Sequence, residues 1–267
     1  MKNAKDKWES GDPYELFMGR WSTLMALEFL NWLNLPHKLR WLDIGCGTGA
    51  LSDMIYKMCE PSELTCIDPS EKFLVMAKEK LGNKGKYFIG RADDIPCADS
   101  SVDLVVSGLA LNFFPELNRA LTEMKRISKP GGIIAAYVWD YSGRMDILRY
   151  FWDAVILTDP ESADLDEGFR FPICNAVNLK NAFQQAGLQE VEVTTLDIPT
   201  PFKDFSDYWN PFLGGQGPAP GYVASLSEEL RDKLKKELQK KLPLEADGSI
   251  KLLGRAIAVR GKTSAQG

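Results

Sequence analysis

The stretch from Leu42 to Gly49 constrains the fold of this chain most, because an apolar run ends at an acidic residue and meets three alternating glycines. Residues 40–44 are predicted to form a short buried strand, and residues 50–59 a helix with one apolar face. The turn between them needs glycine, because its backbone must pass close to a ligand or adopt positive φ. Amides at the start of the following helix carry partial positive charge, so a carboxylate or phosphate is the expected guest.

Glycine spacing and two acidic residues narrow the choice of ligand. A dinucleotide site usually has the pattern G-x-G-x-x-G, whereas residues 45–49 have G-x-G-x-G, with Asp43 two positions upstream. The next apolar strand, residues 64–67, ends in Asp68, which can accept both hydroxyl hydrogens of a ribose. A ligand that carries a ribose for Asp68 and a carboxylate-bearing arm for the glycine turn fits both features. S-adenosylmethionine is such a molecule.

Five motifs in the first half of the chain resemble those of the class I S-adenosylmethionine-dependent methyltransferases, particularly the group of small-molecule enzymes with an LDIGCGTG loop. The resemblance covers roughly residues 41–139 and depends on the order of the motifs, because each one alone is weak. The motifs are the loop at 43–49, the acid in 66–70, and the segments 91–96, 101–107 and 129–132.

An alternation of strands and helices along the chain predicts an α/β fold with a parallel sheet covered on both faces. By resemblance, the last strand runs antiparallel beside strand five, so the expected fold is a doubly wound, Rossmann-like sheet of seven strands. Beyond the first two strands, the sequence predicts strands at 87–90, 102–107, 133–139, 189–196 and 250–260, helices after Ser70 and Pro115 and at 144–158 and 178–186, and a loop at 159–172.

We expect a single methyltransferase domain over residues 1–267, because a chain that is 45% hydrophobic can bury one large core. A helical N-terminal cap is assigned to 1–36, the cofactor-binding core to 37–139 and a helical insertion to 140–175. The roughly fifty residues at 199–248 are long for a connection in this fold, so they are predicted to be a lid or a substrate-recognition insertion.

One helix is predicted inside the 199–248 insertion. Ser225 and Glu228 have the spacing of a capping box, and leucines at 226, 230, 234 and 238 lie on one side of the helix. Its other side is rich in Glu and Lys, and we interpret it as a solvated face.

Composition favours a cytoplasmic enzyme with a small-molecule partner. No apolar run approaches the roughly 20 residues of a membrane span, and residues 1–10 lack the apolar segment of a signal peptide. The five cysteines are odd in number and lack C-x-x-C spacing, which favours free thiols in a reducing compartment and predicts no metal site. A net charge of −5 argues against broad nucleic-acid binding, and the oligomeric state stays open.

The resemblance places cofactor contacts in the segments that follow the strands, where ligands bind in such sheets. In the family, the counterpart of Asp43 orders the glycine loop and lies near the methionyl amino group. Asp68 is the expected ribose acceptor, and an interaction of its charge with the next helix dipole is compatible with that role. The expected cofactor-binding residues are Arg20, Asp43, Gly45, Cys46, Gly47, Gly49, Asp68, Pro69, Ala92, Asp93 and Ser107.

The adenine end departs from the family pattern. Family members often carry an Asp-Ala pair after strand three, but this chain has Arg91 where that acid commonly stands. The acceptor for the adenine amino group is therefore expected at Asp93, or at Asp94 by a small shift. The amide of Ala92 is the expected donor to the ring, because a main-chain donor survives a change of side chain.

Methyl transfer requires few catalytic side chains, because the sulfonium is already an activated methyl donor. The protein mainly aligns the reactants and excludes water. Many relatives carry a His after strand four, where this chain has Asn112. Asn can position a polar acceptor but cannot abstract a proton at neutral pH, which favours an acceptor that is already nucleophilic, or a base such as Tyr supplied elsewhere. No catalytic residue is assigned, and the candidates are Tyr14, Asn112, Tyr141 and Tyr222.

Aromatic residues gather before the first strand, after strand five and around the Gly/Pro-rich segment 214–221. Arg20, among the first group, is a candidate partner for the methionyl carboxylate, and a ring near the sulfonium would gain cation–π attraction. Plain packing is the alternative interpretation of each ring. Together the rings suggest an apolar or aromatic substrate under a mobile cover with glycine hinges.

The sequence therefore predicts transfer of a methyl group from S-adenosylmethionine to an unidentified small molecule by in-line displacement. One alternative is a noncatalytic module that binds S-adenosylmethionine and contacts a protein through the long insertion. A nicotinamide-dependent oxidoreductase is the less favoured alternative, because the glycine spacing and the expected antiparallel last strand argue against it.

Overall fold

The computed structural model describes residues 15–215 and 217–265. These residues form two compact units, and β6 and β7 contribute to both. Unit 1 contains the described residues up to Trp21, together with Trp139–Pro172 and Asp197–Arg255, and unit 2 contains Ser22–Val138, Ile173–Leu196 and the described residues from Ala256 onward.

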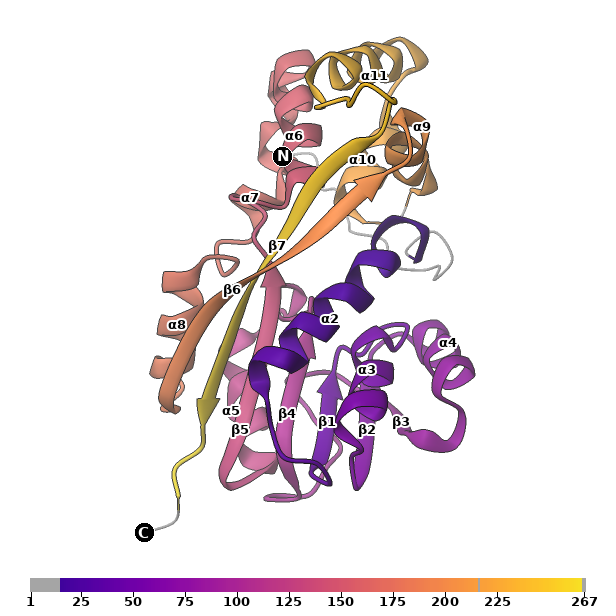
Figure 1. Ribbon diagram of the computed structural model, residues 1–267. Coiled ribbons are helices and arrows are strands. Elements are labelled where there is room, and N and C mark those ends of the chain that lie inside the picture. Colours follow the sequence, from indigo (N-terminus) through magenta and orange to yellow (C-terminus); the bar gives the residue numbers. More distant parts are fainter. Residues whose placement is uncertain (1–14, 216, 266–267) are drawn as a thin grey trace. The chain divides into compact units, whose positions relative to one another are not determined.

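A seven-stranded sheet has the strand order β3-β2-β1-β4-β5-β7-β6 (Figure 1). The neighbours from β3 to β5 are parallel, and β7 runs opposite to β5, so the predicted doubly wound sheet with an antiparallel last strand is confirmed. The strands are β1 Arg40–Ile44, β2 Glu63–Asp68, β3 Lys86–Ile89, β4 Val102–Gly108, β5 Ser128–Trp139, β6 Gln189–Phe202 and β7 Ile250–Lys262.

Helices fill most of the connections between these strands. None of the helices in the described ranges combines the length and the apolar character that a bilayer crossing requires. The α-helices are α2 Arg20–Leu33, α3 Ala50–Cys59, α4 Glu71–Leu81, α5 Leu117–Ile127, α6 Asp146–Thr158, α7 Glu167–Arg170, α8 Ala176–Gln185, α9 Phe205–Trp209, α10 Pro218–Ser225 and α11 Glu228–Lys241, and the shorter turns are the π-helical η1 Glu15–Gly19 and the 3₁₀ turns η2 Gly82–Lys84, η3 Leu111–Phe113, η4 Pro160–Leu165 and η5 Asn210–Gly214.

The first strand and helix of unit 2 follow the sequence prediction closely. β1 is the third strand from one edge and lies between β2 and β4, so its apolar side chains are buried. α3 starts directly after Gly49, and α4 starts after Ser70, whose hydroxyl oxygen accepts the Phe73 amide at 3.4 Å as the N-cap. The C-terminal ends of β1 and β2 are thereby fixed beside each other.

The largest extensions beyond the predicted bounds are those of β5 and β6. β5 begins at Ser128, so Gly131 and Gly132 lie inside the strand instead of ending a helix before it. β6 continues to Phe202, beyond the predicted end at residue 196. The assignments of a cap at 1–36, a core at 37–139 and insertions at 140–175 and 199–248 divide the chain at other residues than the two units do, and they stay predictions.

The prediction of a loop at 159–172 is wrong, because this segment contains η4 and α7. Its order comes from the Asp166 side chain, which accepts the Gly168 amide at 2.8 Å and caps α7. The Arg149 guanidinium holds the same carboxylate at 2.5 Å. The pair of Arg149 with Asp166 joins residues 17 positions apart, which local sequence patterns do not reveal.

The predicted capping box is displaced by two residues. Ser227 is the N-cap of α11, and its hydroxyl oxygen accepts the Leu230 amide at 3.3 Å. Ser225 instead ends α10, where its hydroxyl donates to the Tyr222 carbonyl at 2.7 Å. Ser225 belongs to α10 and its hydroxyl is bonded to a carbonyl of that helix, whereas Ser227, two residues later, caps α11.

Aromatic packing forms the interior of unit 1. The rings of Phe151 and Phe212 stack with centroids 4.6 Å apart, and Tyr208 contacts Phe212 at 5.3 Å. Glu167 is buried in the same unit and accepts a hydrogen bond from the Trp152 indole. Burial is the main reason that the pKa of Glu167 rises to about 8, so this carboxyl group is mostly protonated at neutral pH.

The variant Glu167→Gln is expected to gain stability relative to wild type as the pH rises. The pKa of Glu167 in the folded state lies above its ordinary value of 4.5, so its contribution is fully present below that value and is lost as the pH rises through about 8. Gln keeps an acceptor for the indole without titrating. Urea unfolding should show an advantage for the variant on the order of 1–3 kcal/mol at about pH 9 and little at about pH 4.

Glu161→Gln, an exposed position in the same unit, serves as the matched control and should show no such pH-dependent difference. A stability difference between Glu167→Gln and wild type that is the same at both pH values would contradict the assignment of a raised pKa to Glu167.

Candidate active site

The three glycines of the turn after β1 all have positive φ but differ in their surroundings. The φ angles of Gly45, Gly47 and Gly49 are 69°, 53° and 84°. A Cβ on Gly45 would lie 2.5 Å from the Ala110 Cβ, and one on Gly49 would lie 3.2 Å from the Ala77 Cα. A Cβ on Gly47 would meet nothing within 4 Å. Packing therefore requires the outer two glycines, whereas the middle one borders open space.

Amides of this turn are bonded to the end of β2. The N–H groups of Gly45 and Cys46 donate to the Ile67 carbonyl at 2.8 and 3.1 Å. The Gly47 N–H donates to Asp68 Oδ2 at 2.9 Å. These three amides thus hold the shape of the turn itself, a role that the glycine pattern alone did not indicate.

Asp68 connects the glycine turn with the start of α4. Its Oδ1 accepts the Ser70 amide at 2.8 Å, while its Oδ2 accepts the Gly47 amide. Burial raises the pKa of this carboxyl group, and the two amides oppose that rise. Each carboxylate oxygen retains capacity for a further donor. The neighbouring Pro69, also a predicted contact, is exposed.

Asp43 at β1 carries an unpaired buried oxygen. Its Oδ2 accepts the Ser52 hydroxyl at 2.6 Å, whereas its Oδ1 is buried without a hydrogen-bond partner in the described part of the chain. Burial is the main cause that raises the pKa of Asp43 to about 7, with Asp68 adding to the rise and Ser52 opposing it. An unsatisfied buried acceptor costs about 1–3 kcal/mol, so a ligand that supplies a donor is favoured.

Besides the indole Nε1 of Trp41, near the start of β1, two further side chains of unit 2 hold buried polar atoms without partners among the described residues. These atoms are Ser107 Oγ, on β4, and both amide atoms of Asn112, in η3. Ala110 and Phe114, on either side of Asn112, lie next to Gly45, so this segment packs on the glycine turn. Because native proteins rarely leave buried polar groups unpaired, their occurrence with Asp43 at or after the C-terminal ends of the adjacent strands β1 and β4 indicates a ligand site.

The segment after β3 carries the expected adenine contacts. Ala92 is buried, as a residue whose amide meets a ligand can be, and Asp94 is exposed. Asp93 accepts two bonds from the Arg91 guanidinium, at 2.8 and 3.1 Å, and this pair lowers the pKa of Asp93. Arg91 stands where the family usually has an acid, and it forms an ion pair with Asp93.

The remaining predicted residues belong to unit 1 or lie outside the described residues. Arg20 pairs with Asp207 at 3.1 Å, so its proposed contact with a ligand carboxylate stays a prediction. Tyr141 is buried, and Tyr14 is outside the described residues.

The Tyr222 hydroxyl donates to Asp159 Oδ2 at 3.0 Å. Burial and this bond raise the pKa of Tyr222, which argues against its acting as a base at neutral pH.

Ser52 was not among the predicted residues, although it holds the carboxylate of Asp43. The only signal in the sequence is a hydroxyl residue in the first turn of the helix that follows the glycines. Cys46, which was predicted as a contact, is nearly fully buried, and the thiol of Cys66 together with burial raises its pKa.

Comparison with known proteins shows which family this part of the chain resembles. Residues 42–136 match the methyltransferase domain family. A malonyl-[acyl-carrier protein] O-methyltransferase of Pectobacterium atrosepticum is 40% identical over 97 residues, which is 36% of this chain and 37% of that protein. The chain thus spans well under half the length of this relative.

Solved structures share the fold at low sequence identity. A candidate methyltransferase of Bacillus halodurans gives a TM-score of 0.60 at 16% identity, covering 90% of this chain and 99% of that one. Phosphoethanolamine N-methyltransferase 2 of Haemonchus contortus, solved in complex with S-adenosyl-L-methionine, gives 0.59 at 16% identity, covering 94% of this chain and 57% of that one.

The domain match and the shared fold coincide with the glycine turn and the two acidic strand ends. Residues 42–136 therefore match the methyltransferase domain family, and the chain is similar in fold to solved methyltransferases.

Proposed function

We propose that the chain binds S-adenosylmethionine in unit 2 and transfers the methyl group to a small-molecule acceptor. The observation that carries this proposal is the buried Oδ1 of Asp43, which has no hydrogen-bond partner among residues 15–215 and 217–265. The ammonium group of a methionyl arm supplies both a hydrogen-bond donor and a positive charge for this oxygen. Gly47, where a Cβ would meet open space, leaves room for the arm beside the turn.

Other residues of the same unit fit the rest of this donor. Asp68 retains acceptor capacity for two ribose hydroxyls while its amide bonds keep it in place. The Ala92 amide is the proposed donor to the adenine ring, and Asp93 or Asp94 the proposed acceptor of its amino group. Asp68 ends β2 and the other three residues follow β3, so all of them lie at the C-terminal ends of neighbouring parallel strands.

The chain's side chains position reactants more than they transfer protons. S-Adenosylmethionine supplies an activated methyl group when bound. Asn112 and Ser107 offer buried polar atoms that can orient an acceptor, but neither removes a proton at neutral pH. We therefore propose an acceptor that is nucleophilic without a general base.

A carboxylate acceptor satisfies that condition, since it is ionised at neutral pH. The Pectobacterium relative is named for O-methylation of a malonyl group carried by a protein, so a small acyl acid is a candidate class. The five cysteines form no disulfide, which favours a reducing compartment such as the cytoplasm as the place of reaction.

Binding of S-adenosylhomocysteine should weaken as the pH falls through about 7. Only the ionised Asp43 pairs well with the ligand ammonium, and its pKa in the free protein is about 7. Calorimetry should show the dissociation constant rising by about tenfold per pH unit below that value. Asp43→Asn should bind weakly and lose this pH dependence, whereas Asp53→Asn, which removes an acid paired with Lys57 on the same helix, should behave as wild type. Affinity of wild type that is constant from about pH 5.5 to 8 would rule out the role of Asp43.

Gly47→Ala should abolish donor binding while leaving most of the stability intact. Its Cβ would enter open space that we assign to the ligand, and the left-handed φ costs only about 1–2 kcal/mol. Gly82→Ala is the control, with φ of 61° and open space around its Cβ; because its ψ of −133° is less favourable for a side chain, it should lose at least as much stability while binding S-adenosylhomocysteine normally. Equal affinities of the two variants, measured by calorimetry beside their melting temperatures, would contradict the assignment.

Catalysis itself is tested by supplying isotopically labelled methyl donor to the protein together with metabolite extracts. Mass spectrometry should find a labelled product and an equal amount of S-adenosylhomocysteine with wild type and with Gly82→Ala, but neither with Asp43→Asn. Tight donor binding without product in any extract would instead favour a noncatalytic module that binds the donor.

A further inference from the structure

The segment between β3 and β4 carries the proposed adenine contacts but has little regular structure of its own. Residues 90–101 contain one short bridge, between Arg91 and Asp94, and few internal hydrogen bonds. Two of those bonds are the Asp94 amide to the Arg91 carbonyl at 3.2 Å and the Cys97 amide to the Ile95 carbonyl at 2.7 Å. The conformation of this segment must therefore be held from outside.

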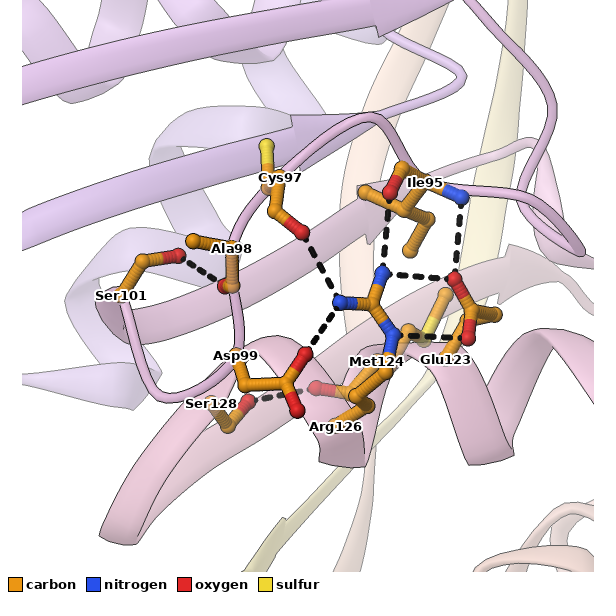
Figure 2. Close-up of polar contacts among 9 residues, drawn as sticks. All are labelled: Ile95, Cys97, Ala98, Asp99, Ser101, Glu123, Met124, Arg126 and Ser128. Carbon is orange, nitrogen blue, oxygen red and sulfur yellow. Dashed lines mark hydrogen bonds and ion pairs between the residues drawn. The ribbon is translucent and has the colours of Figure 1, made fainter.

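Arg126, in the last turn of α5, supplies that hold (Figure 2). Its Nε and Nη2 donate to the two carboxylate oxygens of Glu123, both at 2.8 Å. Its Nη2 also donates to the Ile95 carbonyl at 2.9 Å, and its Nη1 donates to the Cys97 carbonyl at 2.9 Å and to Asp99 at 2.6 Å. All five N–H donors of the guanidinium are thus used.

Glu123 completes the attachment from the same helix. Its Oε2 accepts the Ile95 amide at 3.1 Å, so both main-chain groups of Ile95 are bound. Pairing with Arg126 lowers the pKa of Glu123, which keeps the carboxylate charged. The main-chain carbonyl of Arg126 accepts the Ser100 amide at 3.0 Å. The segment is therefore fixed at residue 95, directly after the proposed adenine contacts at 92–94.

We infer that Arg126 is a positioning residue for the adenine end of the methyl donor, an inference that rests on the proposed function. The fixed Ile95 limits the conformations open to Ala92, Asp93 and Asp94. Without the guanidinium fork, ligand binding itself would have to order these residues, which costs conformational entropy. Arg126 acts through the segment and does not itself touch the ligand.

Arg260 provides a matched comparison within the same unit. Its side chain is 29% exposed, against 31% for Arg126. It likewise pairs with a carboxylate, Glu192, at 2.8 Å and donates to a carbonyl, that of Leu33, at 3.2 Å. It holds strands and a helix end, not a proposed ligand segment. A general loss of stability should therefore affect both arginine variants alike, whereas an effect on adenine recognition should appear only at Arg126.

The test compares Arg126→Lys with Arg260→Lys, since Lys keeps the charge but cannot make the fork. The probes are S-adenosylhomocysteine and S-inosylhomocysteine, which has an oxo group in place of the adenine amino group. Calorimetry should show that wild type and Arg260→Lys prefer the adenine ligand by about tenfold, a typical effect of one lost hydrogen bond. Arg126→Lys should bind S-adenosylhomocysteine about tenfold more weakly and lose most of that preference.

An unchanged affinity and preference in Arg126→Lys, or a wild type that binds both ligands equally, would overturn the inference while leaving donor binding intact. Failure of wild type to bind S-adenosylhomocysteine at all would instead overturn the proposed function. If Arg126→Lys does not fold, Asp99→Ala replaces it, because that carboxylate is 75% exposed and contributes one bond to the fork. A measurable fall in the preference for adenine is then expected, and no fall would count against the inference.

Discussion

The hydrogen bond from the Gly47 amide to Asp68 is the interaction on which the site depends. It joins the turn after β1 to the end of β2, and the same carboxylate reaches the first residues before α4 through Ser70. One buried acid therefore sets the shape of the glycine turn and faces the proposed ribose. Because the turn is shaped before any ligand arrives, little ordering remains to be done on binding.

The distribution of unpaired polar atoms explains why such a rigid site still favours a ligand. Asp43 has one oxygen bonded to Ser52 and one oxygen with no partner in the described part of the chain. Ser107 on the adjacent strand β4, and Asn112 in the segment that packs on the same turn, add further buried atoms without partners in the described part of the chain. Burying such groups costs stability, and a ligand that pairs with them recovers it. The absence of a titrating side chain at Asn112 in turn favours acceptors that need no base.

The sequence predicted the positions of the strands, the glycine turn and its two acids because these features depend on local patterns of apolar residues, Gly and Asp. It did not separate Gly47 from Gly45 and Gly49, because the difference lies in what Ala110 and Ala77 place against each Cα. It also missed Ser52 and Arg126, whose partners are set by tertiary contacts between segments 9 to 31 residues apart. The N-cap of α11 was likewise predicted at Ser225 but lies at Ser227, because Ser225 is part of the preceding helix α10.

A crystal structure of the protein with S-adenosylhomocysteine tests the central claim most directly. The account predicts the methionyl nitrogen at about 2.7–2.9 Å from Asp43 Oδ1, the usual length of a charge-assisted bond, with both ribose hydroxyls on Asp68. A complex in which Asp43 Oδ1 stays unpaired, or in which the ligand lies away from the glycine turn, would contradict it.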